Sequence, residues 1–456
     1  MKINTYEHLK SSGSIWLGDI PTHWGTKKLK FLATVQPSNV DKKTVDGEEP
    51  IILCNYTDVY KNEYIDGRLE FMQASATETE IKKFKVDIGD VIITKDSETP
   101  DDIAVPACIT EEVEGLVCGY HLTQIKPIQL YGRYLFRLFQ SKGFNAQFVV
   151  SANGVTRFGL PQHAIANAFA PVPPPEEQKA IARFLDFKTA QIDALIAKQQ
   201  ALLDKLAEKR TALISHAVTK GLEPSAPMKK SGVDWLGDIP VSWTTKRLRF
   251  LTTMNGGMTP STSNSAYWNG DIPWITPKDM KKDFLSESID TLTDEAIQDT
   301  GITLHESGRV LIVVRGMILA HTFPVAINTV PATVNQDMKA LSTSLNNQYL
   351  AMLLKGIQPL ILSLVEQSAH GTKVLRTDIF KNIHLPVPPS DVQEKIVKQV
   401  ESWLVSLDAQ KSSINSVIER LREYRSALIT NAVTGKIDVR GFQIPDSSIA
   451  TEPSHA

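Results

Sequence analysis

Apolar residues recur with helical spacing along two long stretches of the chain, and each stretch begins just after a proline cluster. In the first, steps of alternately four and three residues from Ile181 to Leu213 meet an apolar side chain at seven of ten positions. The same steps from Ile396 to Leu428 meet one polar side chain, Gln410. A 3.5-residue period sustained over about five heptads predicts a coiled-coil seam on each of two long helices.

The expected seam residues form one stripe on each helix. They are Ile181, Leu185, Ile192, Leu195, Leu202, Leu206 and Leu213, and then Ile396, Val400, Trp403, Leu407, Ile414, Val417, Leu421, Tyr424 and Leu428. Prolines 173–175 and 388–389 suit a helix start, and Glu176, Glu177 and Asp391 add negative charge there. Because a single stripe cannot bury itself, we expect the two helices to pair as an antiparallel coiled coil. The alternative is that each helix lies on a globular core of its own.

The segments before the long helices carry mixed patterns. KVDIGDVIITK (85–95) and SGRVLIVVRG (307–316) each place a turn before a β-branched apolar run, which is typical of a strand. YGRYLFRLFQS (131–141) and NQYLAMLLKGI (347–357) have helical spacing. We therefore predict an α+β fold in which two mixed α/β domains are joined by the two long helices.

The two halves of the chain repeat one plan. GSIWLGDIPTHWGTKKLKFL (13–32) matches GVDWLGDIPVSWTTKRLRFL (232–251), 219 positions later. APVPPPEEQKAIARFL (170–185) matches LPVPPSDVQEKIVKQV (385–400), 215 positions later. The order of repeated block, variable segment, proline cluster and helix predicts an internal pseudo-two-fold repeat. A block that is the same in both halves is expected to build the same junction twice, against the helices or against a partner protein.

This order also sets the expected boundaries. They are a first variable domain over 1–172, a central helix over 173–221, a second variable domain over 222–387, a C-terminal helix over 388–438 and a disordered tail over 439–456. The tail is expected to be disordered because it is rich in Ser and Pro.

Composition narrows the class of protein. With 456 residues, 42% of them hydrophobic and 22% charged, the chain suits a soluble protein of several domains. It has no apolar run long enough for a membrane span and no signal-peptide pattern at its start, so we expect a cytoplasmic location. The net charge of −2 offers no global attraction to nucleic acid, so any such binding must use local patches or a partner's charges.

No catalytic signature emerges from the sequence. We find no phosphate-binding loop, no glycine-rich nucleotide or S-adenosylmethionine pocket, and no amino-methyltransferase tetrapeptide. The histidines and carboxylates lack metal-ligand spacing, and Cys54, Cys108 and Cys118 suit reduced, buried thiols. We expect neither a catalytic residue nor a metal ligand in this chain.

The repeated organisation resembles the specificity (S) subunit of type I restriction–modification systems. The resemblance is carried by the WLGDIP blocks, by the PVPP helix entries with Gln178 and Gln393, and by the R-[TS]-A-L-I helix ends. IPWITPKDM (272–280), VRGMILAHTFPVAI (314–327) and VNQDMKAL (334–341) are similar to stretches of the family's target-recognition domains. The resemblance extends to about residue 438.

The resemblance implies a DNA-binding subunit without catalysis of its own. In that family each variable domain reads one half of a split, asymmetric site on double-stranded DNA, and the paired helices set the spacer. The S subunit binds two methyltransferase (M) subunits for adenine-N6 methylation and restriction/motor (R) subunits for cleavage. S-adenosylmethionine, ATP and magnesium would then be bound by these partners and not by this chain.

Candidate DNA contacts are polar and basic residues in loops, because base edges are read by hydrogen bonds and phosphates by positive charge. The expected residues are Lys95, Ser97, Thr99, Thr156 and Arg157 in the first domain, and Thr276, Lys278, Lys281, Lys282, Arg315, His321, Thr372, Lys373 and Arg376 in the second. For each of them, an ordinary turn residue or a solvated charge is the alternative.

Two other functions stay open. One is a non-catalytic coiled-coil scaffold whose α/β domains bind proteins or other ligands, which the near-neutral charge favours. The other is an enzyme with an unfamiliar active site, which methyl transfer or cleavage by the chain alone would reveal.

Overall fold

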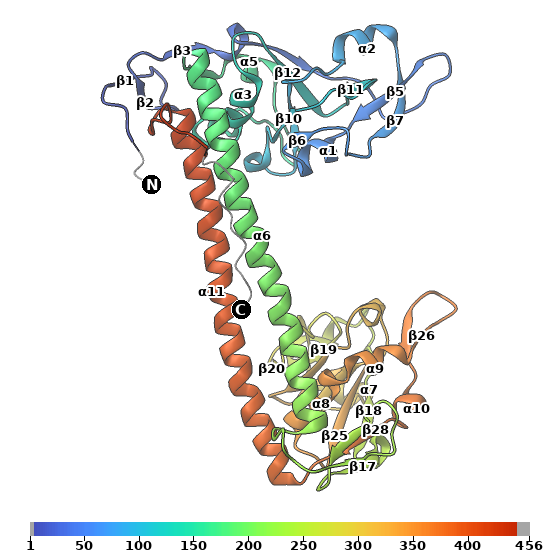
Figure 1. Cartoon of the computed structure of the whole chain (residues 1–456). Coiled ribbons are helices and arrows are strands. Elements are labelled where there is room, and N and C mark those ends of the chain that lie inside the picture. Colours follow the sequence, from blue (N-terminus) through green and yellow to red (C-terminus); the bar gives the residue numbers. More distant parts are fainter. Residues whose placement is uncertain (1–3, 445–456) are drawn as a thin grey trace. The chain divides into compact units, whose positions relative to one another are not determined.

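The computed structural model describes residues 4–444 and divides into two compact units (Figure 1). The first unit contains the chain up to Gln199 and the stretch from Ser416, and the second contains Gln200–Asn415. Two long helices, α6 (Pro175–Lys220) and α11 (Ser390–Val433), contribute a segment to each unit. Of the expected tail, residues 445–456 lie outside the described part of the chain.

The first variable domain is built on a five-stranded sheet in the order β4-β12-β8-β10-β6 and a three-stranded sheet in the order β11-β5-β7. These strands are β4 (Ala33–Pro37), β5 (Glu49–Cys54), β6 (Tyr64–Ile65), β7 (Met72–Ala76), β8 (Val91–Thr94), β10 (Pro106–Ile109), β11 (Leu116–Cys118) and β12 (Leu122–Pro127). The helices are α1 (Tyr56–Lys61), α2 (Glu78–Phe84), α3 (Gly132–Phe139), α4 (Lys142–Val149) and α5 (Gln162–Asn167). Three strand pairs complete the domain: β1 (Leu9–Ser11) with β2 (Asp19–Pro21), β3 (Gly25–Lys28) with β14 (Phe169–Val172), and β9 (Asp96–Ser97) with β13 (Phe158–Gly159).

The second variable domain repeats this topology, with sheets in the orders β18-β25-β22-β23-β20 and β21-β19-β24. These strands are β18 (Thr252–Gly256), β19 (Trp268–Ile275), β20 (Phe284–Leu285), β21 (Asp290–Leu292), β22 (Val310–Val313), β23 (Val325–Asn328), β24 (Thr333–Val334) and β25 (Met338–Thr343). The helices are α7 (Asp294–Thr300), α8 (Asn347–Gly356), α9 (Gln358–Ser363) and α10 (Thr377–Phe380), with a 3-10 turn, η5, at Met317–Ala320. The strand pairs are β15 (Met228–Lys230) with β16 (Asp238–Pro240), β17 (Thr244–Arg247) with β28 (His384–Val387), and β26 (Val365–Gln367) with β27 (Lys373–Leu375).

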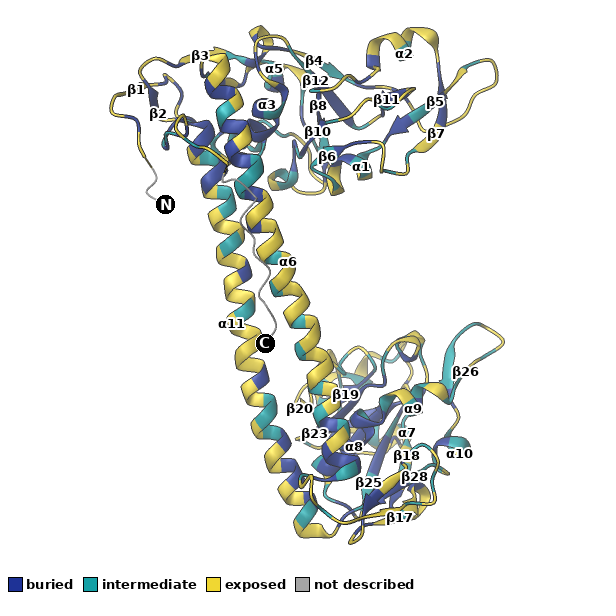
Figure 2. Cartoon of the chain, viewed as in Figure 1, coloured by how far each residue is buried: buried dark blue, intermediate teal, exposed yellow. Residues whose placement is uncertain are grey.

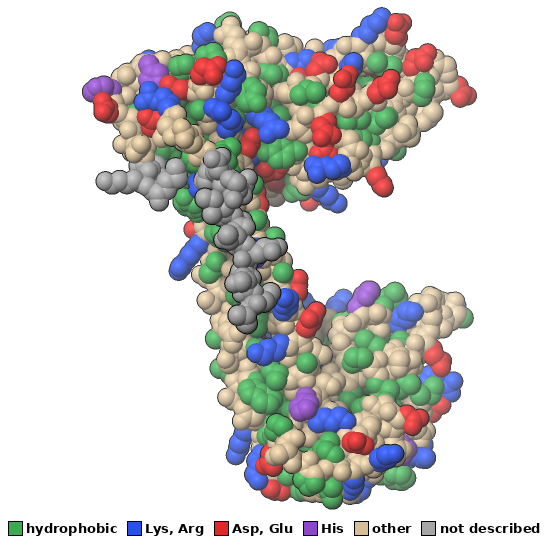
Figure 3. Space-filling model, in the orientation of Figure 1, with side chains coloured by type: hydrophobic (Ala, Val, Ile, Leu, Met, Phe, Trp, Pro, Cys, Tyr) green, Lys and Arg blue, Asp and Glu red, His purple; other side chains and the backbone are tan. Residues whose placement is uncertain are grey.

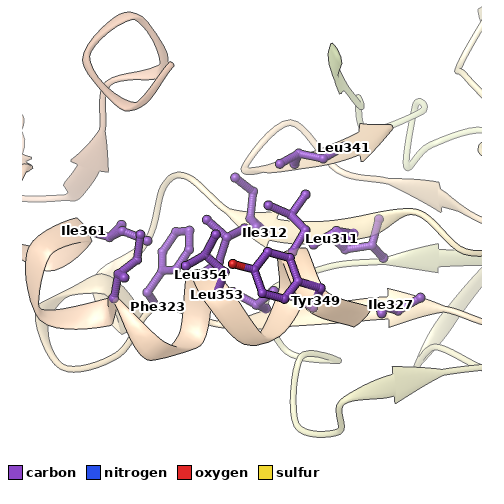
Figure 4. Packing of buried hydrophobic residues seen from close by; sticks show 14 of the residues in the cluster. Leu311, Ile312, Phe323, Ile327, Leu341, Tyr349, Leu353, Leu354 and Ile361 are labelled. Atoms are coloured by element: carbon purple, nitrogen blue, oxygen red, sulfur yellow. The ribbon is translucent and has the colours of Figure 1, made fainter. Parts of the chain in front are cut away.

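The predicted strands and helices of the variable segments are confirmed. The apolar runs form the central strands β8 and β22, in which every residue is buried, and the helically spaced segments form α3 and α8. In the second domain, Tyr349, Leu353 and Leu354 of α8 pack over Leu311 and Ile312 of β22 (Figure 4). The predicted α+β class with two mixed domains is therefore confirmed.

Each domain shares its hydrophobic core with segments of both long helices. In the first unit, Ile181 and Leu185 of α6 join Leu428 and Ile429 of α11 in one buried cluster with α3. In the second unit, the end of α6 and the start of α11 join α8 in the same way. Figure 2 shows these buried helix ends and the exposed outer faces of the helices.

Ion pairs also join the two helices within each unit. In the second unit, Arg210 Nη1 donates to Asp408 Oδ1 at 2.8 Å. In the first unit, Arg425 Nε donates to Asp193 Oδ1 at 2.9 Å, and its Nη2 donates to Glu63 Oε1 at 2.5 Å. The two cross-helix pairs occupy matching positions of the sequence repeat, because Arg210 matches Arg425 and Asp193 matches Asp408, each 215 positions apart.

Two expected seam residues of α6 lie outside the buried stripe. Leu195 and Leu202 are 46% and 44% exposed, and their neighbours Ile196 and Leu203 are half-buried in their place. The sequence carries two adjacent apolar residues at both points, so the phase of the seam is ambiguous by one residue. The spacing of the buried positions changes near the domain. There Thr189, which is 2% exposed, follows Leu185 by four residues, just as Leu185 follows Ile181.

The same correction applies to two residues of α11. Val417 and Tyr424 are 38% and 51% exposed, whereas Ile418 is 4% exposed and Arg425 is half-buried. Arg425 takes the inner position of the pair because Asp193 and Glu63 compensate its charge. The other expected seam residues are buried or half-buried.

The repeated block closes the end of the long helix that belongs to the other half of the sequence. In the first unit, Lys436 Nζ, just after α11, donates to the Asp19 carbonyl. In the second unit, Lys220 Nζ, at the end of α6, donates to the carbonyls of Leu236 and Asp238, each at 2.6 Å. The repeated hexapeptide therefore serves one junction that is built twice.

A glycine in each junction lets the helix end pass close to a buried tryptophan. Gly435 and Gly221 have φ of +70° and +87°, the left-handed conformation that ends helices. A Cβ on Gly435 would lie 2.2 Å from Pro21 and 3.2 Å from Trp24, and Gly221 faces Trp243. In each copy of the block the second tryptophan, Trp24 or Trp243, is buried against this helix end. The first tryptophan, Trp16 or Trp235, is half-buried.

Candidate nucleic-acid interface

In the first domain, the β9–β13 pair brings together all five expected DNA contacts. Ser97 pairs with Phe158 and Asp96 with Gly159, so the loop holding Thr156 and Arg157 lies beside Lys95 and Thr99. Thr156, Arg157 and Thr99 are exposed, Lys95 is half-buried, and Ser97 is buried with its Oγ accepting from the Thr99 N–H at 3.3 Å.

Two residues that the sequence analysis did not select complete this surface. His121 has φ of +70°, and its Nδ1 hydrogen-bonds the Asp96 carboxylate. Arg157 Nη2 lies 3.3 Å from the same nitrogen. Tyr120 is 49% exposed, its ring centroid lies 3.9 Å from that of His121, and Lys95 Nζ lies 4.8 Å from the ring. The result is a partly exposed group of aromatic, cationic and acidic side chains.

In the second domain, Arg315, Thr372 and Lys373 come together at the corresponding place. Arg315 forms an isolated antiparallel bridge with Val374, and the Gly316 N–H donates to the Lys373 carbonyl at 2.9 Å. Lys373 Nζ donates to Gln367 Oε1 at 3.2 Å across the β26–β27 hairpin. The Arg315 side chain is exposed, as base or phosphate contact requires.

The remaining expected residues of the second domain are spread over three further places. Arg376 donates to Asp378 at 2.7 Å, and this hydrogen bond lowers the pKa of the Asp378 carboxyl. His321 is exposed just after η5. Thr276 is buried, and its Oγ1 donates to Asp279 Oδ2 at 2.8 Å. Thr276 thus shapes a turn and does not point outward.

The basic run after Thr276 is exposed. Lys282 pairs with Glu287 at 3.1 Å, whereas Lys278 and Lys281 have no ion-pair partner among the described residues. The strand before this turn ends at Ile275, whose carbonyl accepts from the Asn335 N–H at 3.1 Å. Exposed Gln336 therefore lies near the turn, and its Oε1 accepts from Thr259 Oγ1 at 2.5 Å.

The sequence did not point to Tyr120 and His121, between β11 and β12, or to Gln336 and Asp337, between β24 and β25. The short apolar segments on either side of them are typical of buried strands, which conceals exposed residues between them. The available signal in the second domain was the run of three polar residues, 335–337, within VNQDMKAL.

Charge is mixed across the visible surface of each unit. Figure 3 shows Lys and Arg side chains among Asp and Glu side chains, without a field of one sign on the face drawn. Over residues 4–444, no group of three or more His, Cys, Asp or Glu side chains is placed to hold a metal ion. Within the same residues, no helix is both long and apolar enough to cross a membrane.

Comparison with known proteins identifies related sequences. A family model described as "Type I restriction modification DNA specificity domain" matches residues 21–205 and 240–420. The specificity subunit of the type I restriction enzyme EcoR124I/EcoR124II of Escherichia coli is 29% identical over 56% of this chain and 59% of its own length. The MjaIX specificity subunit of Methanocaldococcus jannaschii is 30% identical over 41% of this chain and 43% of its own length. The chain thus spans about half the length of these two curated relatives.

A third relative aligns over nearly its full length. The putative type I restriction enzyme MjaX specificity subunit of M. jannaschii is 21% identical over 93% of this chain and 96% of its own length. Two solved structures share the fold at 16% sequence identity. A chain from a study of complex assembly and conformational transition of the type I R-M system has a TM-score of 0.70, covering 92% of this chain and 99% of its own. The HsdS subunit from Thermoanaerobacter tengcongensis has a TM-score of 0.51, covering 92% and 98%.

Proposed function

This chain belongs to the type I restriction–modification DNA specificity family, and we propose that it reads a split, asymmetric sequence on double-stranded DNA. One observation carries the proposal: the chain contains two domains of the same topology, and each exposes its own set of polar and basic side chains at the corresponding place. Because those side chains differ between the domains, the two half-sites differ in sequence. Each half-site is read in the grooves, and phosphate contacts fix the position of each domain.

The long helices set the unspecified spacer between the half-sites. They have 46 and 44 residues, which at about 1.5 Å per residue makes each about 65–70 Å long. Their paired stretches form an antiparallel coiled coil, which the cross-helix pairs Arg210–Asp408 and Arg425–Asp193 support. An internal pseudo-two-fold axis then presents the two domains to DNA as a dimeric reader would.

Catalysis belongs to partner proteins. In this proposal two methyltransferase subunits bind the chain and methylate adenine N6, and restriction/motor subunits cleave DNA. S-adenosylmethionine, ATP and magnesium are bound by those subunits. The net charge of −2 is consistent with a partner that supplies much of the attraction to the phosphates.

The decisive experiment compares N6-methyladenine across the genome of the native host with and without this gene. We expect methylation to disappear at one split, asymmetric motif when the gene is removed. Exchange of residues 30–165 for the equivalent domain of a relative should then change one half-site and leave the other unchanged. A change in both half-sites would contradict the assignment of one domain to each half-site.

The near-neutral charge favours a second candidate, a scaffold whose domains bind proteins or other ligands. The purified complex with its methyltransferase separates the two functions in a duplex-binding assay at low salt, where phosphate contacts are strongest. Absence of binding there, together with an unchanged methylation pattern in the host, would support the scaffold.

A further inference from the structure

We propose that one small surface in each domain holds the side chains that distinguish bases. This reading shelf consists of residues 95–97, 120–121 and 157–158 in the first domain and 314–316, 336–337 and 372–373 in the second. The inference rests on the proposed DNA-reading function and assigns specificity to residues within it. It includes Tyr120, His121, Gln336 and Asp337.

The backbone of the shelf is built the same way in both domains. Three backbone hydrogen bonds in each domain define it, and each bond of the first domain has a counterpart in the second. They are Lys95 N–H to His121 O (3.0 Å) and Val314 N–H to Asp337 O (2.8 Å), Leu160 N–H to Lys95 O (2.8 Å) and Leu375 N–H to Val314 O (2.8 Å), and Gly119 N–H to Cys54 O (2.9 Å) and Asn335 N–H to Ile275 O (3.1 Å). The two domains therefore hold these residues in equivalent positions.

The side chains on this common backbone differ at every matched position. The pairs are Lys95 and Val314, Asp96 and Arg315, Ser97 and Gly316, Tyr120 and Gln336, His121 and Asp337, Arg157 and Thr372, and Phe158 and Lys373. Some buried positions nearby are the same in both domains, such as Leu160 with Leu375 and Tyr134 with Tyr349, whereas Thr94 matches Val313. Four of these side chains are exposed, Tyr120, Arg157, Arg315 and Gln336, and Val314 is buried. A constant backbone frame that carries different side chains is the arrangement expected where two domains recognise different sequences.

The chemistry of the shelf suits base edges. Arg315 and Gln336 are exposed and can each form paired hydrogen bonds, with guanine and adenine respectively. In the first domain, Asp96 orients the His121 ring, and Lys95 lies against the exposed ring of Tyr120. Each domain thus offers donors, acceptors and a different shape at the same place.

The basic run 278–282 offers lysine donors without the acceptors found on the shelf. Its turn corresponds to the start of α1 in the first domain, because Asp279 accepts from the Thr276 N–H at 2.8 Å as Asp58 accepts from the Asn55 N–H at 2.7 Å. Lys282 is already paired with Glu287. Lysines 278 and 281 suit phosphate contacts, which strengthen binding to all sequences alike. This run therefore supplies a matched control.

The test exchanges six of the seven shelf residues of the first domain for those of the second and keeps buried Ser97, whose Oγ accepts from the Thr99 N–H. The six changes are Lys95→Val, Asp96→Arg, Tyr120→Gln, His121→Asp, Arg157→Thr and Phe158→Lys, in the full chain expressed with its partner methyltransferase. We expect the methylated half-site read by the first domain to change or relax, with the other half-site and the spacer unchanged. The control Lys278→Ala/Lys281→Ala should lower methylation at the original motif without changing its sequence.

Single changes keep the test decisive if the six-fold variant fails to fold or assemble. His121→Asn preserves a residue type that tolerates positive φ, and Gln336→Ala removes only the amide. Each should reduce discrimination at one base pair by on the order of tenfold. If both variants, or the six-fold variant, methylate the original motif with full discrimination, the shelf does not read bases. If the unaltered complex methylates no motif, the proposed function fails instead.

Discussion

Glu177 lies in the first turn of α6 with only 9% of its surface exposed, and its carboxylate meets three side chains of the first domain. Tyr6 Oη donates to it at 3.1 Å, Trp24 Nε1 donates at 2.7 Å, and His23 Nε2 lies 2.7 Å away. The matching residue of the second half is Val392, so this polar cluster exists in one half only.

We predict that Glu177→Gln destabilises the first unit by about 2 kcal/mol, because a neutral amide accepts weaker hydrogen bonds and places an N–H against donors. Urea unfolding followed by tryptophan fluorescence measures the change. Glu176→Gln, one residue earlier and exposed, is the matched control and should change stability by less than about 0.5 kcal/mol. Equal effects of the two substitutions would contradict a special role for the buried carboxylate.

His305 gives the second unit a pH dependence. It is 5% exposed, its Nε2 has no hydrogen-bond partner among the described residues, and burial together with nearby Arg309 lowers its pKa. The unfolded chain takes up a proton below about pH 6.5, whereas the folded protein does so only at lower pH. The contribution of His305 to stability is therefore complete above about pH 6.5 and is lost as the pH falls.

We expect His305→Gln to weaken the loss of stability between about pH 7.5 and about pH 5.5. Urea midpoints of the variant and the unaltered protein at both values provide the measurement. A pH dependence that is the same in both proteins would show that His305 does not contribute to it.

Residues of the candidate interface could be predicted from the sequence only where they lie in a loop that turn residues and charge mark locally. Thr156 and Arg157 lie in a loop marked by Gly154, and the sequence shows both the turn and the charge. Tyr120 and Gln336 are exposed because the chain crosses from one sheet to another there. That crossing depends on strand pairs distant in sequence, so no local pattern could show it.

At the scale of elements, periodicity predicted the long helices and the central strands, because both patterns are local and sustained. The phase of the seam could not be predicted where two apolar residues adjoin, since either would fit a 3.5-residue period. Which of the two residues is buried depends on packing against the domain and, at Arg425, on its ion pairs with Glu63 and Asp193.

The corrected phase predicts unequal effects of two adjacent substitutions. Ile418→Ala should cost about 2–4 kcal/mol, because it leaves a cavity at a buried position. Val417→Ala, at a neighbouring position that is 38% exposed, should cost less than about 1 kcal/mol. Urea midpoints of the two variants compare them, and a larger effect at Val417 would restore the phase first expected from the sequence.

At the scale of the whole molecule, the proposed spacer function predicts a change in the DNA site. Residues 203–209 of α6 and 409–415 of α11 adjoin the Arg210–Asp408 pair on the two helices. Removing both heptads keeps the seam in phase and shortens the helix pair by about 10 Å. At about 3.4 Å per base pair, we expect a spacer shorter by about three base pairs.

Methylation mapping measures the new spacer directly. Deleting residues 203–209 alone is the matched control. It shortens one helix and not the other, so the side chains of the two helices no longer meet in register, and we expect site-specific methylation to be lost. An unchanged spacer with full activity in the double deletion would exclude the helices as the determinant of spacing.

The division of the chain into units also bears on the order in which it folds during synthesis. The second unit is one continuous stretch, Gln200–Asn415, whereas the first needs the end of α11, where Tyr134 donates to the Val433 carbonyl and Gly435 packs on Trp24. The ribosome therefore releases every residue of the second unit before the first can close its core. The half that is made first is completed last, and until then it exposes apolar surface that chaperones recognise.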